Sequence, residues 1–297
     1  MSEPFRWNIK KREQLGSLLN GSVEHEDGYY FGIKHYLDVL PKSCARILSL
    51  SDNSDLIFIG RSLEKAFDYI SGVLFGTSWE DRCVLLNVSL PESHDIVRGK
   101  YPGAVKGFRK QLSSLGLNPA CLQSRKRGIA FVDLIMSGNT LGNLHDFLMK
   151  ISDTEQVDRK SVKRKVRFIV GTEERHTSPN IYRWYQDKSG TPWIREYKPR
   201  QLRSFTIDPF LWDHLIYDHQ RSLSQWNPPW RWGDTSIEYA HHDKESLESL
   251  RLCYDLYTAA TSSVHKQSFL RLLQKENSVK YPWFRGLISE LKKSISQ

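Results

Sequence analysis

The chain has 297 residues, 39% of them hydrophobic, with a formal net charge of +9 and a pI near 9.3. This length and composition allow a buried core in one large domain or two smaller ones. The mean hydropathy of -0.52 and the lack of any apolar run of bilayer length exclude a transmembrane helix, so no membrane association is expected. The positive charge indicates that phosphorylated ligands or nucleic acid are attracted before specific contacts form.

The cysteines and histidines predict no metal site held by the protein itself. The four cysteines lie far apart and form no CxxC pair, which also excludes a disulfide framework. The Asp/His groups at 213–214, 218–219 and 241–243 match no metal-ligand spacing. The first residues, MSEPFRW, lack the charged-then-apolar order of a secretory signal. Together these features favour the cytoplasm.

Short apolar runs alternate with helical patterns between about residues 47 and 172, which is typical of parallel strands joined by crossover helices. The runs that predict strands are mostly apolar on both faces, as a sheet covered on both sides requires. They are 56–60, 84–90, 128–133 and 166–171. Apolar residues at helical spacing predict helices at 63–74, 105–115 and 141–151, with Ser62 as the cap of the first. The predicted fold is a doubly wound, mostly parallel α/β sheet.

The composition changes after residue 172. Up to about residue 234 the chain is rich in Trp, Tyr, Pro and Arg with weak periodicity, which predicts loops with short strands. Within it, Trp226–Trp232 contains two adjacent prolines and is predicted to be a connector or a lid. Residues 235–297 carry apolar stripes at helical spacing. We therefore expect an α/β domain over 1–234, with its core at about 47–172, and a helical C-terminal region over 235–297.

Residues 128–142 are the most informative stretch, because an apolar strand ends in Asp133 and runs through a Ser-Gly-Asn-Thr turn into a helix. The backbone amides of residues 137–141 are predicted to point into one hollow at a helix N-terminus, where unpaired donors and the helix dipole favour an anion. Gly138 permits close approach of the backbone to a phosphate, and Asn139 tolerates the left-handed conformations of such loops. The stretch therefore predicts a phosphate-binding loop.

The ten residues 132–141, VDLIMSGNTL, resemble the signature of the type I phosphoribosyltransferases, in which acidic residues precede two apolar residues and a Thr/Ser-Gly-x-Thr-Leu loop. In that family the loop holds the 5′-phosphate of phosphoribosyl diphosphate, and an acid just before it contacts the ribose. The resemblance implies that Asp133 is the catalytic acid at the ribose. It also implies that the phosphate is bound by Ser137, Gly138, Asn139, Thr140 and Leu141.

A second loop agrees with this resemblance. Gly60, Arg61 and Ser62 follow the first predicted strand and open a helix, where the family places a short loop against the diphosphate. Gly60 is expected to allow close approach, Arg61 to supply a cation and Ser62 a hydroxyl. The family further implies Mg²⁺, bound mainly through the substrate diphosphate. The implied protein is a glycosyltransferase that moves a phosphoribosyl group to an acceptor, with both loops facing one cleft.

Two alternatives follow from the same residues. Val132 stands where the family has the first of two acids, which favours a catalytically silent relative that senses a nucleotide or phosphosugar. A nucleic-acid-binding module is the other alternative, because basic runs at 124–127 and 159–167 suit a phosphate backbone and the nine tryptophans suit base stacking. Each basic run also abuts a predicted strand, which favours a solvated loop over a nucleic-acid contact.

Overall fold

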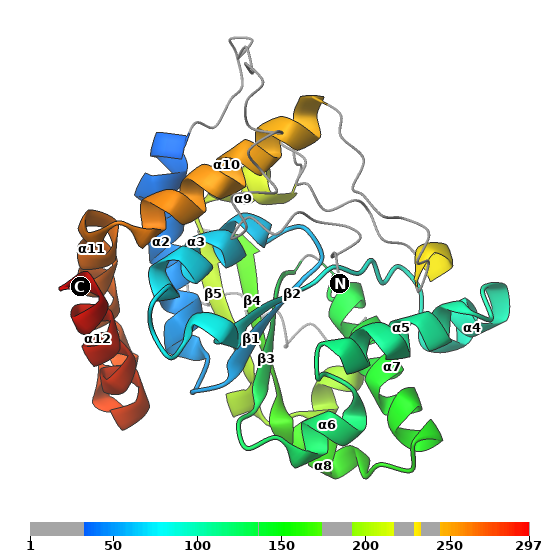
Figure 1. The fold of residues 1–297 in the computed structure, drawn as a ribbon. Helices are drawn as coiled ribbons and strands as arrows, with labels where there is room; N and C mark the ends of the chain where they lie inside the picture. Colours follow the sequence, from blue (N-terminus) through cyan, green and yellow to red (C-terminus); the bar gives the residue numbers. More distant parts are fainter. Residues whose placement is uncertain (1–32, 136, 174–191, 217–228, 233–243, 297) are drawn as a thin grey trace, which may run out of the picture.

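The computed structural model describes residues 33–135, 137–173, 192–216, 229–232 and 244–296 (Figure 1). In this part of the chain, five parallel strands form one sheet in the order β2-β1-β3-β4-β5. The strands are β1 (Asp55–Ile59), β2 (Cys83–Leu86), β3 (Ile129–Leu134), β4 (Val166–Glu173) and β5 (Leu202–Ile207). The predicted α/β class with a parallel sheet is confirmed.

Helices lie on both faces of the sheet, as in a doubly wound fold (Figure 1). One face is covered by α2 (Ile33–Leu50), α3 (Glu64–Leu74), α10 (Lys244–Thr261), α11 (Ser263–Gln274) and α12 (Pro282–Ile295). The other is covered by α4 (His94–Lys100), α5 (Ala104–Ser114), α6 (Pro119–Ser124), α7 (Asn139–Thr154) and α8 (Arg159–Lys165). Each layer buries its own hydrophobic cluster against the strands. None of the described helices combines the length and apolar character needed to span a bilayer.

The remaining short elements join these layers. They are α9 (Pro209–Ile216) and the 3-10 turns η1 (Glu80–Arg82), η3 (Pro192–Glu196), η4 (Pro199–Gln201), η5 (Pro229–Arg231) and η6 (Asn277–Lys280). The C-terminal segment is helical, as predicted, and α10 packs closely on α3. A Cβ atom at Gly72 of α3 would lie 2.4 Å from the carbonyl oxygen of Tyr257, so this contact requires glycine. The predicted domain boundary at 234/235 stays a prediction.

Helices α2, α4, α6, α8 and α9 were not predicted from the sequence. β5 is a short strand in the segment expected to hold loops with short strands, although its position was not predicted. Only half of the side chains of β5 are buried, as an edge strand allows, so its apolar signal is weak. α2 contains Pro41, a residue that normally interrupts helices. Its apolar positions Tyr36, Leu40 and Cys44 are fully buried, so tertiary packing holds this helix in place.

The strand order determines where a ligand can bind. The chain goes from β1 to β2 at one side and then returns to β3 at the other side, so β1 lies between them. In open α/β sheets, the carboxyl ends of two strands whose connections leave in opposite directions enclose a crevice, and ligands bind there. The crevice between the ends of β1 and β3 is therefore the expected site.

Candidate ligand-binding cleft

A cleft of about 340 Å³ lies at the carboxyl ends of β1 and β3. Both predicted loops contribute to it, together with the segment after β2 and helix α9. Its lining residues are Ile59, Gly60, Arg61, Ser62, Val88, Ser89, Leu90, Pro91, Asp133, Thr140 and Leu215. The structure thus brings Gly60–Ser62 to the same cleft as Asp133 and Thr140, across adjacent strands.

The loop after β1 presents an unpaired cation to the cleft. Gly60 has a φ of +63°, and its amide donates to the carbonyl of Leu86 at 2.9 Å, so this amide is occupied. Arg61 is half-buried and has no acidic partner in the described part of the chain. Ser62 does not cap α3 as expected, because Leu63 occupies the cap position and no side chain bonds there. Its hydroxyl therefore remains at the cleft.

The loop after β3 leaves backbone donors available. Gly138 caps α7 with a φ of +80°. The left-handed position is thus Gly138 and not Asn139, because glycine adopts this conformation without steric cost. The amides of Gly138, Thr140 and Leu141 have no protein acceptor within the described residues. Unpaired amides at a helix N-terminus form an anion site.

The flanking residues of that loop are placed differently. Ser137 and Asn139 are exposed, and the amide of Asn139 lies 3.5 Å from the Ser137 hydroxyl, a long contact. Neither residue lines the cleft, whereas Thr140 is half-buried at its wall and Leu141 is buried. The predicted phosphate loop is therefore present with its amides unoccupied, but only Thr140 of these residues lines the cleft itself.

Asp133 is a buried acid at the floor of the cleft. Its side chain is 6% exposed, and Oδ1 accepts the amide of Leu134 at 2.8 Å. Burial raises the pKa of Asp133 to about 8, and the single hydrogen bond opposes this shift only in part. The neighbouring Val132 points to the opposite face of the strand and is fully buried in the cluster shared with α2 and α3. Apolar packing therefore occupies the position of the family's first acid.

Two parts of the cleft were missed by the sequence analysis. The second strand was expected to reach residue 90, but β2 ends at Leu86, and residues 88–91 form one wall of the cleft. The side-chain amide of Asn143 on α7 donates to the carbonyl of Leu90 at 2.8 Å and holds this wall against α7. Leu215 comes from α9, in the segment with weak periodicity, where no local signal indicated a site.

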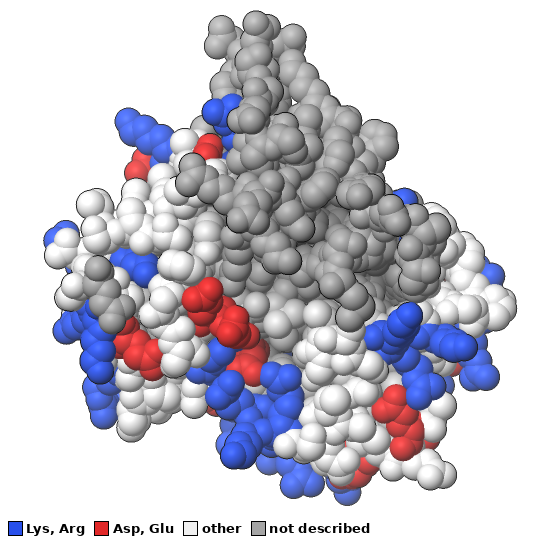
Figure 2. Space-filling view, viewed as in Figure 1, with Lys and Arg blue, Asp and Glu red and all other residues white. Residues whose placement is uncertain are grey.

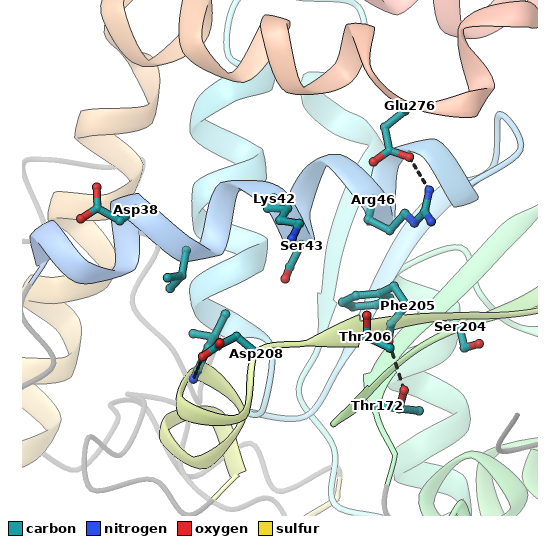
Figure 3. Close-up of a pocket in the computed structure, with 12 residues that line it drawn as sticks. Asp38, Lys42, Ser43, Arg46, Thr172, Ser204, Phe205, Thr206, Asp208 and Glu276 are labelled. Carbon is teal, nitrogen blue, oxygen red and sulfur yellow. Dashed lines mark hydrogen bonds and ion pairs between the residues drawn. The ribbon is translucent and has the colours of Figure 1, made fainter. Parts of the chain in front are cut away.

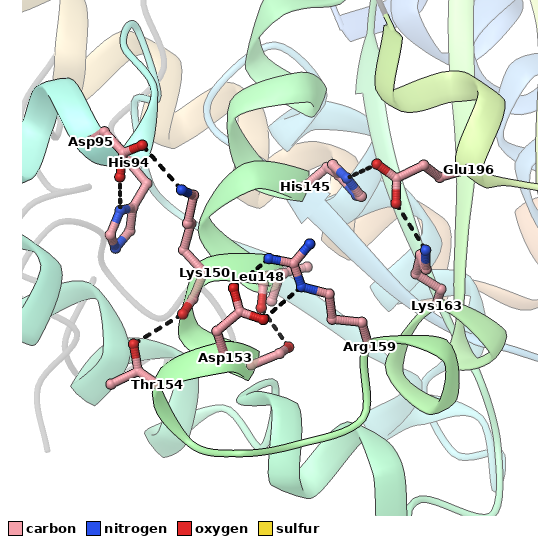
Figure 4. A network of polar contacts seen from close by, with 11 residues as sticks. His94, Asp95, His145, Leu148, Lys150, Asp153, Thr154, Arg159, Lys163 and Glu196 are labelled. Atoms are coloured by element: carbon pink, nitrogen blue, oxygen red, sulfur yellow. Dashed lines mark hydrogen bonds and ion pairs between the residues drawn. The ribbon is translucent and has the colours of Figure 1, made fainter.

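The basic runs lie away from the cleft and are partly neutralised. Run 159–167 forms α8 and the start of β4, and three of its cations pair with acids: Arg159 with Asp153, Lys163 with Glu196, and Arg167 with Asp52. Figure 4 shows the first two pairs and His145, whose ring also contacts Glu196. Figure 2 shows a further group of basic side chains at the lower edge of the molecule, near α6.

The aromatic and histidine groups give no second site within the described residues. Trp232 packs between Phe108 and Phe147, with ring centroids 5.0 and 5.3 Å away, and Trp230 is 53% exposed. Trp226 and the groups at 218–219 and 241–243 lie outside the described residues. Among the residues that the structure describes, no three potential His, Cys, Asp or Glu ligands come together as a metal site.

Comparisons of the chain with protein-family profiles, with curated proteins and with solved structures find no match. The function is therefore inferred from the geometry and chemistry of the cleft.

Proposed function

We propose that the cleft binds a phosphorylated ribose, with phosphoribosyl diphosphate as the best-fitting ligand, and that the protein is a phosphoribosyltransferase-like enzyme. One observation carries the proposal: the two loops that resemble the family signature line one cleft at the ends of adjacent strands. If the two loops only began the helices α3 and α7, they would not need to line the same cleft. The position also matches the general rule for ligand sites in open parallel sheets.

The charges of the cleft suit a ligand with two anionic groups. The amides of Gly138, Thr140 and Leu141 would bind a monophosphate at the start of α7. Arg61 would bind the diphosphate at the start of α3, because a guanidinium forms charge-assisted hydrogen bonds to phosphate oxygens. The ribose would lie between these groups with its hydroxyls toward Asp133.

The proposed reaction breaks the bond between ribose C1 and the diphosphate, so positive charge develops on the sugar while the acceptor attacks. An ionised Asp133 would stabilise that charge electrostatically from its place in the cleft. Arg61 stabilises the departing diphosphate. The protein otherwise acts by holding the sugar and the leaving group in line.

The cleft offers one carboxylate for a cation. A single acid, Asp133, suits Mg²⁺ that is held mainly by diphosphate oxygens, since Mg²⁺ commonly combines one or two carboxylates with substrate phosphates. When bound, Mg²⁺ would neutralise negative charge on the diphosphate. Asp133 would then be ionised in the complex, although burial keeps it protonated near neutral pH in the free protein.

A silent sensor is the second candidate, and the burial of Val132 favours it. With the family's first acid replaced by a core side chain, one carboxylate is left to stabilise the charged sugar. Such a protein would bind the same ligand without turnover. The nucleic-acid alternative has less support, because acids already pair with three cations of the second basic run.

Calorimetric titration with phosphoribosyl diphosphate and Mg²⁺ tests the proposal. We expect binding by the wild-type protein and an affinity lower by roughly tenfold or more in Arg61→Gln, because a hydrogen bond to a charged group contributes about 1.5–3 kcal/mol. The control Arg271→Gln removes an exposed cation of α11 and should bind like the wild type. No binding at millimolar ligand would end the proposal.

Diphosphate release separates the enzyme from the sensor. With water as the acceptor, an enzyme slowly releases diphosphate from the bound ligand, and Asp133→Asn should abolish this release. Binding without release, unchanged in Asp133→Asn, would favour the sensor.

A further inference from the structure

A second groove runs along the edge strand β5. Two pockets of about 560 and 450 Å³ share Arg46 and Ser204 and so form one continuous groove. Figure 3 shows α2 lying along β5, with Ser43 and Arg46 on the helix and Thr206 on the strand around the larger pocket. None of the residues of this groove lines the cleft between β1 and β3.

The backbone of β5 is available on its groove side. Within the described residues β5 pairs only with β4. The hydroxyl of Thr172 on β4 donates to the carbonyl of Phe205 at 3.3 Å, so Phe205 turns its backbone groups toward β4. Because these directions alternate along a strand, Ser204 and Thr206 turn their N–H and C=O groups into the groove. An open edge of this kind is a template for an added strand.

The side chains of α2 have the spacing that an added strand needs. Asp38, Lys42 and Arg46 lie four residues apart on one side of the helix and line the groove. Their spacing along the helix is about 6 Å. Alternate side chains of an extended strand lie about 6.7 Å apart on one face. Two or three alternate side chains of a strand in the groove would therefore each face one residue of this row.

The charge of the smaller pocket favours an acidic occupant, whereas the larger pocket is mixed, because Asp38 and Asp208 line it together with Lys42. Arg200, Arg203 and Lys280 line the smaller pocket and have no acidic partner in the described part of the chain. The acids beside them are already engaged: Glu276 pairs with Arg46 at 2.7 Å, and Asp52 pairs with Arg167. The end of the groove nearest the start of β5 thus carries an excess of cations.

We propose that this groove binds an extended acidic segment of a partner protein, which adds to β5 as a further strand. The backbone groups of Ser204 and Thr206 would pair with the added strand. Arg200, Arg203 and Lys280 would bind its carboxylates. The site is independent of the cleft, so either proposal can fail without the other.

A fluorescein-labelled acetyl-Glu-Val-Glu-Val-Glu-Val-amide peptide is the probe, and fluorescence anisotropy is the measurement. The wild-type protein should bind it, and Thr206→Pro should lower the affinity about tenfold, because proline removes the groove-facing N–H without affecting the ladder to β4. Thr206→Ala keeps that N–H and should bind like the wild type. The double change Arg200→Glu and Arg203→Glu should abolish binding.

Controls make each outcome decisive. Equal unfolding temperatures of the proline and alanine variants show that β5 remains folded. The proposal is overturned if the probe does not bind at millimolar concentration, if Thr206→Pro binds as well as Thr206→Ala, or if an acetyl-Lys-Val-Lys-Val-Lys-Val-amide probe binds equally. A dimer detected by light scattering and dissociated by Thr206→Pro would also overturn it, since the occupant would then be a second copy.

Discussion

Asp55 and Asp133 are buried aspartates on neighbouring strands, at opposite ends of the sheet. They are 5% and 6% exposed. The carboxylate of Asp55 accepts hydrogen bonds from Arg82 and Arg127, each at 3.0 Å, and from Arg125. Burial alone would raise the pKa of Asp55, but the bonds from the three arginines outweigh it and lower the pKa. Asp133 has no cation partner among the residues that the structure describes, and burial raises its pKa to about 8.

The difference shows at which end of the sheet the protein itself supplies partners for the buried charges. At the amino end every charge of the cluster has a partner, and the guanidinium of Arg82 also lies 3.4 Å from the centre of the Trp79 ring. At the carboxyl end, within the described part of the chain, Asp133 and Arg61 have no oppositely charged partner and several amides have no acceptor. A buried polar or charged group without a partner costs folding free energy. Such groups cluster at functional sites, where a bound ligand supplies the missing partner. The first end serves stability, and the second is the proposed binding site.

Removal of Asp55 tests the stability side of this comparison and should have the largest effect. Asp55→Ala leaves the buried Arg82 without its carboxylate, and breaking a buried ion pair typically costs about 3–5 kcal/mol of unfolding free energy. Urea denaturation at pH 7 measures the loss. The matched change Asp153→Ala breaks an exposed pair with Arg159 and should leave the midpoint unchanged. Equal effects of the two changes would contradict the comparison.

Replacement of Asp133 should raise the free energy of unfolding, in contrast to the replacement of Asp55. Between about pH 4 and pH 8 the unfolded chain releases this proton while the folded protein keeps it, so stability falls by about 1.4 kcal/mol per pH unit through this group. Asp133→Asn removes this contribution. Denaturation of both proteins from pH 5 to pH 8 should show that the variant's advantage grows with pH and levels off near pH 8. Parallel profiles would show that Asp133 is not held protonated by burial.

A pair of glycine substitutions should have the smallest effect on stability and sharpens the comparison. Gly60 and Gly76 have φ angles of +63° and +77°, so alanine at either position costs about 1 kcal/mol of unfolding free energy. A Cβ at Gly60 meets only the Val88 carbonyl at 3.5 Å, and one at Gly76 meets nothing. The unfolding temperature should therefore fall by the same amount in Gly60→Ala and Gly76→Ala. Only Gly60→Ala should weaken phosphoribosyl diphosphate binding in calorimetry, because Gly60 lines the cleft.

Local sequence patterns were sufficient for the central strands and for the two loops. β1 and β3 are buried along almost their whole length, so their residues are apolar on both faces and stand out from their surroundings. The strand-to-helix change after β3, with its small residues, predicted unpaired amides at the start of α7. β5 and α9 could not be predicted in the same way, because neighbouring elements and not their own periodicity stabilise them. The apolar residues of α2 do recur at helical spacing, but Pro41 interrupts its helical signal.

The sequence by itself determined the α/β class and the strand-to-helix loop with unpaired amides within residues 137–141, since both depend on residues close together in the chain. Only the tertiary structure decided that β1 lies beside β3, which brings Arg61 to the same cleft as Asp133. It also decided that Asp55 meets Arg125, a residue 70 positions away, and that Val132 is buried in the core. Strand order and charge pairing depend on packing between distant segments, and local periodicity carries no information about either.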